Sequence, residues 1–412
     1  MKYGVIGEHL KHSFSPEIHS QIGDYEYIIK EIEPENLEAF IKEKDFLGIN
    51  VTIPYKEKVI PMLDYVEPSA LAIGAVNTVV NKDGKLYGYN TDYSGMKALA
   101  QRIGLEIKGK KVLVVGTGGT SKTATAVLTD LGAREIIYVS NIEAPKAISY
   151  EEVYAYHTDC EIIFNTSPVG MYPRNDGIPL ELERFPRLEG VLDVVYNPIK
   201  TRLVLKAQSL GLKAEGGLYM LGAQAVYASE HFFGGECDNT IFERVYKAVL
   251  LGKDNITLVG MPSCGKTTVG KRLAELTGKT FVDTDEAISQ KIGMPISEYF
   301  EKHGEAAFRE VECGVIAEIS ARNNQIIATG GGAVLRQENV TRLKQNGQIY
   351  FIDRDLDLLC PTGDRPLSSN REALKKRYDE RYGIYCDVCD FKIDGNGTVE
   401  EVANLIYKEY LK

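Results

Sequence analysis

Short apolar runs alternate with longer amphipathic segments over the first hundred residues of this chain. Residues 3–7 and 49–53 are apolar runs of strand length, whereas apolar positions in residues 37–48 recur with the helical period. Asp83-Gly84, between two apolar stretches, predicts a hairpin turn. We therefore expect one α/β layer here, with an amphipathic helix that ends at Gly48.

A second pattern begins near residue 108, where the apolar runs are more continuous. Residues 108–141 have the order strand, glycine-rich turn, helix and strand, which is typical of a βαβ unit. Apolar runs at 160–168 and 190–198 predict buried strands of a parallel sheet, and residues 218–250 have a helical pattern. These features indicate a Rossmann-type fold.

A short polar stretch at residues 251–255 precedes a third set of elements. Helical patterns near 266–276 and 305–320 alternate there with further runs of strand length. The 412 residues are also too many for one ordinary domain. We therefore predict an α/β chain with a linker at 251–255 and a separate domain with a parallel sheet over 254–412.

The amino-acid composition limits which classes of molecule this protein is expected to bind. The formal net charge of −10 disfavours nucleic-acid binding through bulk charge, whereas small anions need only local positive charge. Cys386 and Cys389 lack the second cysteine pair of a zinc site, and no apolar run approaches the ~20 residues that cross a bilayer. Unpaired thiols and the lack of an apolar N-terminal signal favour a cytoplasmic protein with small-molecule substrates and no membrane partner.

The glycine-rich turn within residues 108–141 is the first candidate site. Its glycines let the backbone approach a pyrophosphate, which the N-terminus of the following helix attracts. The residues expected at this site are Gly116, Gly118, Gly119, Thr120 and Ser121. The second strand is followed by Asn141 with no acidic residue, which favours a phosphorylated ribose, with Lys122 and Lys146 as candidate cations.

Polar residues stand where strands end or helices begin in the first layer. They are Ser13 and Ser15, then Asn50, Thr52 and Lys56, then Asn90, Thr91 and Asp92. A lysine beside an aspartate can shuttle a proton at a carbonyl group under reduction, because the carboxylate orients the ammonium. Taken singly, each of them is also an ordinary polar residue of a loop.

Together these motifs resemble those of shikimate dehydrogenase across essentially all of residues 1–250. The matching segments are HSFSPEIHS, GINVTIPYKEKV, GAVNTV, NTD, GTGGTSKTA, NTSPVGMYP, DVVYNP and GGLYMLGAQA. The resemblance implies reversible hydride transfer between 3-dehydroshikimate and NADPH, with a substrate domain over 1–100 and 220–250 and an NADP-binding Rossmann domain over 101–219.

The same resemblance assigns Lys56 and Asp92 as the catalytic pair. It assigns to the substrate Ser13, Ser15, Asn50, Thr52, Asn77 and Gln224, and to the nicotinamide region Tyr196 and Gly217. Where the family commonly has an arginine for the 2′-phosphate, this chain has Asn141, so the sequence leaves NADP and NAD both open.

The second candidate site is a full P-loop pattern, Gly260-x4-Gly265-Lys266-Thr267, between a strand and a helix. Loop amides wrap phosphates, Lys266 reaches the β- and γ-oxygens, and the Thr267 hydroxyl takes a Mg²⁺ position. The remaining residues expected to contact the nucleotide are Ser263, Cys264 and Thr268. The chain lacks an Asn-Lys-x-Asp signature, which disfavours a GTPase.

Charged residues downstream complete this site. Asp283 and Asp285 lie two apart at a strand end, so one can hold Mg²⁺ through water and the other can accept a substrate proton. Arg309 and Arg381 fit a bidentate grip on a carboxylate, and Arg365 lies in a polar loop suited to a lid.

These features resemble shikimate kinase, a P-loop protein of the nucleoside-monophosphate-kinase type, across residues 254–412. The resemblance implies transfer of the ATP γ-phosphoryl to the 3-hydroxyl of shikimate. It assigns Asp285, Arg309, Gly331 and Arg381 to shikimate, Asp283 to the Mg²⁺ shell, and Lys266, Asp285 and Arg365 to catalysis. Cys360-Pro361 replaces the arginine that relatives often place against adenine.

The two resemblances predict one bifunctional enzyme, because the product of the first reaction is the substrate of the second. Alternatives remain open at this point. Only one half could be catalytic, with the other a ligand-binding regulatory module, or the dehydrogenase could act on quinate. The sequence does not give the oligomeric state.

Overall fold

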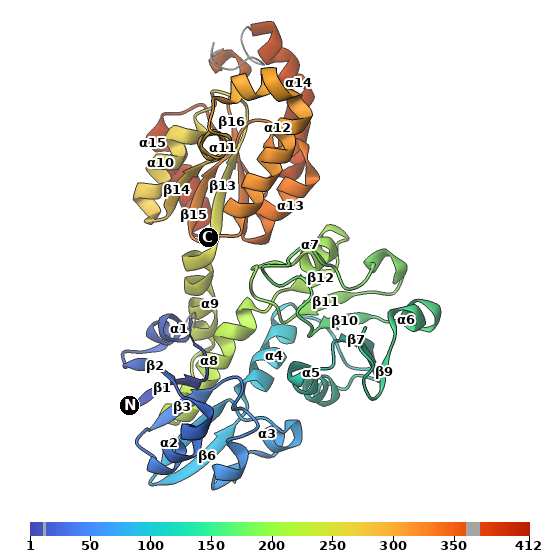
Figure 1. The fold of residues 1–412 in the computed structure, drawn as a ribbon, viewed down its shortest axis with the longest axis vertical. Coiled ribbons are helices and arrows are strands. Elements are labelled where there is room, and N and C mark those ends of the chain that lie inside the picture. Colours follow the sequence, from blue (N-terminus) through green and yellow to red (C-terminus); the bar gives the residue numbers. More distant parts are fainter. Residues whose placement is uncertain (11–13, 360–370) are drawn as a thin grey trace. The chain divides into compact units, whose positions relative to one another are not determined.

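The computed structural model describes residues 1–10, 14–359 and 371–412, and it divides into two compact units, Met1–Leu250 and Leu251–Lys412 (Figure 1). Both units combine parallel strands with helices, so the predicted α/β class is confirmed. Among the described residues, no helix has both the length and the apolar character needed to cross a membrane.

The first sheet of the N-terminal unit has the strand order β2-β1-β3-β5-β6-β4. Its strands are β1 (Tyr3–Gly7), β2 (Tyr27–Glu31), β3 (Gly48–Val51), β4 (Tyr65–Val66), β5 (Thr78–Lys82) and β6 (Lys85–Tyr89). The accompanying helices are α1 (Ser15–Ile22), α2 (Leu37–Glu43), α3 (Pro68–Ile73) and α4 (Thr91–Arg102). Strands β5 and β6 form the predicted hairpin, with positive φ at both Asp83 and Gly84.

The amphipathic helix expected over residues 37–48 is shorter than predicted. Helix α2 ends at Glu43, and Lys44 follows in the left-handed conformation. Gly48 does not end the helix but begins β3, where a Cβ would lie 2.3 Å from the Phe232 ring. Close packing against α8 (Leu218–Phe233) therefore requires this glycine, and the helical period could not reveal that.

The second sheet has the order β12-β11-β10-β7-β8-β9, and its strands pair in parallel. Its strands are β7 (Lys111–Val115), β8 (Glu135–Val139), β9 (Ala147–Ile148), β10 (Ile162–Asn165), β11 (Gly190–Asp193) and β12 (Lys213–Glu215). Its helices are α5 (Gly119–Asp130), α6 (Tyr150–Tyr156) and α7 (Arg202–Ser209). The sequence β7-α5-β8 is the predicted βαβ unit, and every residue of β7, β10 and β11 is buried.

Helices α4 and α8 pack closely at Gly95. A Cβ there would lie 2.9 Å from the Met220 carbonyl oxygen and 3.2 Å from Gln224 Cβ. Because α4 carries Asp92 and α8 carries Gln224, this contact fixes two predicted site residues relative to each other.

The sheet of the C-terminal unit has the parallel order β14-β15-β13-β16-β17. Its strands are β13 (Asn255–Val259), β14 (Thr280–Asp283), β15 (Gln325–Ala328), β16 (Gly347–Asp353) and β17 (Phe391–Asp394). Its helices are α10 (Lys266–Thr277), α11 (Thr284–Ile292), α12 (Ile296–Ser320), α13 (Gln337–Gln345), α14 (Arg371–Val388) and α15 (Val399–Tyr410). The helix expected near 305–320 is the second part of α12, which is kinked at Gly304.

The polar stretch at residues 251–255 is not an exposed loop. It consists of the end of α9 (Asn239–Lys253), Asp254 and the first residue of β13. Lys279 Nζ donates to the Leu251 carbonyl oxygen at 2.7 Å and pairs with Asp254 Oδ1 at 3.2 Å, while the Tyr410 hydroxyl donates to Asp254 Oδ1 at 2.7 Å. These polar side chains belong to a buried cluster at the start of the C-terminal unit.

Candidate functional sites

The structure brings Lys56 and Asp92 together. Lys56 follows β3, and Asp92 lies in the first turn of α4, where Asn90 caps the helix by accepting from the Tyr93 amide at 3.1 Å. Lys56 Nζ donates to Asp92 Oδ2 at 2.6 Å, and the two side chains remain 29% and 21% exposed. The pair is thus both ordered and accessible to a substrate.

Asn50 and Asn77 form a buried amide layer beside this pair. Asn50 Nδ2 donates to Thr78 Oγ1 at 3.0 Å and to the Asn77 carbonyl oxygen at 3.3 Å. Asn77 Oδ1 accepts from the Thr91 amide at 2.7 Å and from the Thr91 hydroxyl at 3.2 Å. These contacts fix the orientation of both amides, and Thr91 precedes Asp92 directly in the chain.

His19 is a site residue that the sequence analysis missed. It lies one helical turn after Ser15 on α1, stacks on Tyr27 at 3.8 Å, and its Nδ1 is 2.5 Å from the Tyr25 hydroxyl. Burial lowers the pKa of His19 to about 3, although a hydrogen bond with Asn50 acts in the opposite direction. Tyr27 in turn donates to Asn50 Oδ1 at 2.7 Å, so a neutral histidine and a tyrosine support this amide.

The other residues predicted to bind the substrate differ in their position and burial. Thr52 and Gln224 are partly exposed, and Gln224 Nε2 donates to the Leu221 carbonyl oxygen at 3.0 Å. Ser15 begins α1, whereas Ser13 lies outside the described residues.

The glycine-rich turn leaves open space at the N-terminus of α5. Gly116 has φ of 102°, and a Cβ there would lie 3.1 Å from the Ser167 amide nitrogen. At Gly118 and Gly119, by contrast, a Cβ would meet no atom within 4 Å. Thr120 and Ser121 continue the first turn, with Ser121 Oγ donating to the Gly118 carbonyl oxygen at 2.6 Å. The arrangement fits a pyrophosphate, because the glycines at this helix end border open space and a helix N-terminus attracts anions.

The region after β8 is exposed. Asn141 has an exposed side chain, and Ser140 Oγ accepts from the Ile142 amide at 3.0 Å. Lys122, one of the two candidate cations, lies 3.5 Å from Glu57 Oε1. Lys146 is exposed and adopts a positive φ of 67°.

A buried carboxyl group, missed by the sequence analysis, organises the loops near Tyr196 and Gly217. Asp193 Oδ2 accepts from the Thr201 hydroxyl at 2.6 Å, and Oδ1 accepts from Asn165 Nδ2 and the Val195 amide, each at 3.0 Å. Burial raises the pKa of Asp193 to about 6, against the effect of these donors. The carboxyl group thereby joins the end of β10 to the loop that follows β11.

Tyr196 lies three residues after the end of β11, and Gly217 lies two residues after the end of β12. Tyr196 is 40% exposed, and Gly217 caps α8. A Cβ at Gly217 would lie 2.1 Å from the Val194 carbonyl oxygen, so only glycine fits.

The P-loop of the C-terminal unit folds around its own lysine. Gly260, Ser263 and Gly265 have φ of 146°, 66° and 99°. Lys266 Nζ donates to the carbonyl oxygens of Gly260 at 2.9 Å and Met261 at 3.0 Å. Cys264 is buried in the same loop, and Thr268 Oγ1 donates to the Gly265 carbonyl oxygen at 3.2 Å.

A hydroxyl and a carboxylate meet beside this loop. Thr267 Oγ1 donates to Asp283 Oδ2 at 2.8 Å, and Asp283 Oδ1 caps α11 by accepting from the Asp285 amide at 3.0 Å. Oxygen ligands of this kind fit Mg²⁺, which keeps several waters and takes few protein ligands.

The three glycines after β15 lie against the predicted shikimate-binding residues. A Cβ at Gly330 would lie 2.5 Å from Asp285 Oδ1. A Cβ at Gly332 would lie 2.5 Å from each of the two terminal nitrogens of Arg309. The Gly331 carbonyl oxygen accepts from Arg381 Nη1 at 3.0 Å. The bare backbone therefore lets these three side chains converge on one segment.

Glu312 and Tyr385 are supporting residues that the sequence analysis missed. Glu312 is buried and pairs with Arg309 Nη1 at 2.7 Å, and burial raises the pKa of Glu312 despite this partner. Tyr385 donates to the Gly331 carbonyl oxygen at 2.5 Å, beside Arg381. Spacing could have found both, because Glu312 is three residues after Arg309 and Tyr385 four after Arg381 on helices.

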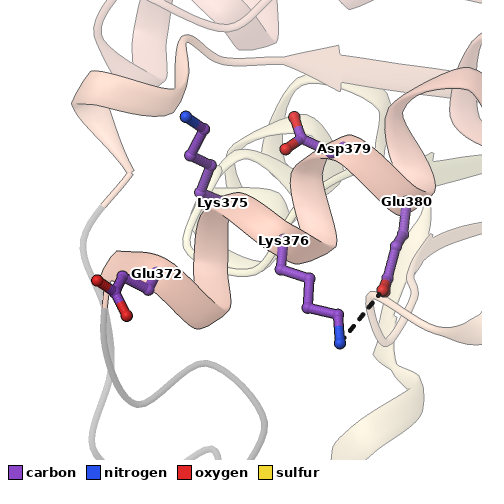
Figure 2. Close-up of a pocket in the computed structure, with 5 residues that line it drawn as sticks. All are labelled: Glu372, Lys375, Lys376, Asp379 and Glu380. Carbon is purple, nitrogen blue, oxygen red and sulfur yellow. Dashed lines mark ion pairs between the residues drawn. The ribbon is translucent and has the colours of Figure 1, made fainter.

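Arg365 and Cys360-Pro361 lie outside the described residues. A hollow of about 470 Å³ on α14 is lined by Glu372, Lys375, Lys376, Asp379 and Glu380 (Figure 2). It contains no predicted site residue, and Lys376 pairs with Glu380 at 3.9 Å. In the described part of the chain, no group of three or more His, Cys, Asp or Glu side chains could hold a metal ion.

Comparisons with known proteins match both units. Residues 5–79 match the family described as shikimate dehydrogenase substrate binding domain, and residues 262–411 match the shikimate kinase family. Shikimate dehydrogenase (NADP(+)) of Clostridium perfringens is 37% identical over 263 residues, which cover 60% of this chain and 97% of that protein.

Two solved structures resemble the N-terminal part. A chorismate mutase/shikimate 5-dehydrogenase fusion protein from Clostridium acetobutylicum is 32% identical, with a TM-score of 0.57 over 60% of this chain and 96% of that one. Shikimate 5-dehydrogenase from Thermus thermophilus, in complex with NADP(H) and shikimate, is 29% identical. Its TM-score is 0.54 over 60% of this chain and 99% of that one.

Proposed function

Because the chain belongs to the shikimate dehydrogenase family in its N-terminal part and carries a shikimate kinase domain at residues 262–411, we propose that it is a bifunctional shikimate-pathway enzyme. The N-terminal unit reduces 3-dehydroshikimate to shikimate with NADPH. The C-terminal unit then phosphorylates shikimate with ATP. The same chain thus makes a substrate and consumes it.

The observation that carries this proposal is that each unit brings reacting groups from separate segments into contact. The 2.6 Å contact between Lys56 and Asp92 supplies an oriented acid for carbonyl reduction. The P-loop, with Thr267 2.8 Å from Asp283, supplies a phosphate and metal site for phosphoryl transfer.

In the dehydrogenase site, we assign proton transfer to Lys56. Bound NADPH supplies the hydride for the carbonyl carbon of 3-dehydroshikimate. Lys56 Nζ hydrogen-bonds the carbonyl oxygen and gives it a proton, while Asp92 keeps the ammonium in place. The fixed amides of Asn50 and Asn77 orient the hydroxyl groups of the substrate. Their hydrogen bonds, from Asn50 to Thr78 on β5 and from Thr91 of α4 to Asn77, prevent them from rotating.

The relatives support NADP as the cofactor. NADP(+) is part of the printed name of the Clostridium perfringens relative, and the Thermus thermophilus structure contains NADP(H) with shikimate. We assign the pyrophosphate to the open N-terminus of α5 at Gly118 and Gly119, and the ribose to Asn141.

In the kinase site, the chain acts by positioning and charge. With ATP and Mg²⁺ bound, Lys266 would turn from its loop carbonyls to the phosphates, and Thr267 and Asp283 would hold Mg²⁺. Asp285 accepts the proton of the attacking 3-hydroxyl of shikimate. Arg309 and Arg381 hold the shikimate carboxylate, each already fixed against the glycine segment.

A one-pot reaction tests the proposal. The full chain is incubated with 3-dehydroshikimate, NADPH, ATP and Mg²⁺, and products are followed by mass. Lys56→Ala should leave 3-dehydroshikimate unconverted, whereas Lys266→Ala should let shikimate accumulate. Phosphorylation by the Lys266 variant, or faster turnover of quinate than of shikimate in the reverse direction, would contradict the assignment.

A further inference from the structure

The inward face of α14 carries an arginine that none of the assignments above includes. The buried residues of this helix are Leu374, Arg381, Tyr385 and Val388. Arg377 lies on the same stripe, three residues after Leu374 and four before Arg381, and its side chain is half-buried. Long cations on a buried stripe are uncommon unless they have a partner.

Within the described structure, Arg309 has carboxylate partners, whereas Arg377 and Arg381 have none. Arg309 pairs with Glu312 at 2.7 Å and with Glu305 at 3.1 Å. Neither Arg377 nor Arg381 forms an ion pair with a carboxylate among residues 1–10, 14–359 and 371–412. Burial and then the nearby charge of Arg381 lower the pKa of Arg377, and Arg309 adds to this effect.

Like charges one helical turn apart repel each other, and partial burial removes the water that would weaken the repulsion. An anion placed between the guanidinium groups would reverse the sign of this interaction. Arg377 and Arg381 share one face of α14, and Arg381 and Arg309 both contact the segment 331–332. Arg309 and Arg381 therefore meet at one segment, and Arg377 lies one helical turn from Arg381 on α14.

We propose that Arg377 is a third arginine of the shikimate carboxylate site, together with Arg309 and Arg381. The proposal rests on the kinase function proposed above. The charged groups that act on Arg377 are Arg381, Glu380, Glu305 and Arg309. Its helix neighbour Arg381 and Arg309 are the two arginines assigned to the shikimate carboxylate, so the anion of the proposal is that carboxylate and not the transferred phosphoryl group.

This role predicts an effect on binding and not on the chemical step. The carboxylate keeps its charge from the bound substrate to the transition state, so an arginine that binds it stabilises both equally. Removal of Arg377 should raise the KM for shikimate and leave kcat almost unchanged.

The test compares Arg377→Met with Lys375→Met in the full chain at saturating ATP. Lys375 is an exposed cation on the same helix, so the control removes equal charge from α14. We expect Arg377→Met to raise the KM for shikimate about tenfold or more with kcat within about twofold, and Lys375→Met to change neither. Arg377→Lys should recover part of the loss, because it keeps the charge without the planar fork.

A neutral substrate separates recognition of the carboxylate from general damage. The wild-type chain should have a lower kcat/KM for the carboxamide of shikimate than for shikimate. Arg377→Met should reduce the ratio of these two kcat/KM values by the same factor by which it raises the KM for shikimate. An equal loss for both substrates, a fall in kcat at unchanged KM, or wild-type kinetics would each overturn the proposal. A wild-type chain that does not phosphorylate shikimate would instead overturn the kinase function itself.

Discussion

At the scale of single residues, the two sites depend on buried polar side chains whose partners come from distant segments. Asp193 joins Asn165, Val195 and Thr201, and Asn77 joins β5 to the start of α4. Such groups cost free energy on burial unless their hydrogen bonds are made, so each network is formed as a whole. Changes at these residues should therefore have effects beyond their own contacts.

The raised pKa of Asp193 predicts an unusual pH dependence of the stability of the folded chain. Its pKa is about 6 in the folded chain against an ordinary 3.8, so the native state holds a proton that the unfolded chain has already lost. The stability contributed by Asp193 therefore falls as pH rises from 4 to 6, opposite to an ion-paired carboxylate. Relative to Asp193→Asn, which mimics the protonated group, wild type should lose up to about 3 kcal/mol over this range.

Hydrogen exchange of residues 190–205 at several pH values, corrected for intrinsic rates, measures this difference. The protection of wild type relative to Asp193→Asn should decline from pH 4 to pH 7. A relative protection that grows with pH would show that the carboxylate is stabilised in its ionised form.

The place assigned to Asp283 in the Mg²⁺ site predicts that its substitution changes the Mg²⁺ dependence of the kinase. Asp283→Asn should raise the Mg²⁺ concentration needed for half-maximal kinase activity about tenfold or more, because a carboxylate of the metal shell is lost. Dehydrogenase activity of the same preparation should remain unchanged, which provides an internal control. An unaltered Mg²⁺ dependence would remove Asp283 from the metal shell.

The role of a single residue could be predicted from the sequence where the residue belongs to a motif with a fixed chemical role. The roles of other residues were harder to predict. Lys56 and Asp92 are 36 residues apart and in contact, as the motif order implies. His19, Asp193 and Glu312 were missed because their role arises from burial among segments that only the fold brings together. The sequence did offer a signal for each of them, because His19 lies in the segment HSFSPEIHS, Asp193 begins the segment DVVYNP, and Glu312 is three residues after Arg309.

At the scale of elements, glycines that permit close approach position the site. Gly95 lets α4 and α8 touch, and Gly330 and Gly332 let Asp285 and Arg309 approach one segment. The predicted βαβ unit and the hairpin at Asp83-Gly84 follow from local patterns. The early end of α2 does not, because the packing of Gly48 on Phe232 is a tertiary requirement that overrides the helical period.

Gly95→Ala should therefore separate the two helices. With the Met220 carbonyl oxygen 2.9 Å from the new Cβ, we expect a loss of about 1–3 kcal/mol of stability and a lower kcat/KM of the dehydrogenase. Gly314→Ala is the matched control, because a Cβ on α12 meets nothing within 4 Å and should be neutral or stabilising. Thermal unfolding and both activities measure the effects; an unaffected dehydrogenase in Gly95→Ala would argue against close α4–α8 packing.

At the scale of the whole molecule, two units with separate cores catalyse consecutive steps. Among the described residues, the hydrophobic clusters of Met1–Leu250 and Leu251–Lys412 share no buried residue. We therefore expect each unit to keep its activity when the other is disabled. The restart of the strand–helix pattern at Ile256 is the signal from which the sequence predicts a separate domain over residues 254–412. It did not predict that the polar residues near 254 are buried, because polarity alone does not distinguish an exposed loop from the buried cluster of Lys279 and Tyr410.

The most direct test of two consecutive reactions on one chain is the stoichiometry of the wild-type enzyme. With 3-dehydroshikimate limiting and NADPH, ATP and Mg²⁺ in excess, NADPH oxidised and ADP released are measured in one vessel. We predict equal final amounts of the two, ADP formation that lags behind NADPH oxidation, and no ADP when NADPH is omitted. ADP release without NADPH, or NADPH oxidation with no ADP at all, would contradict the account.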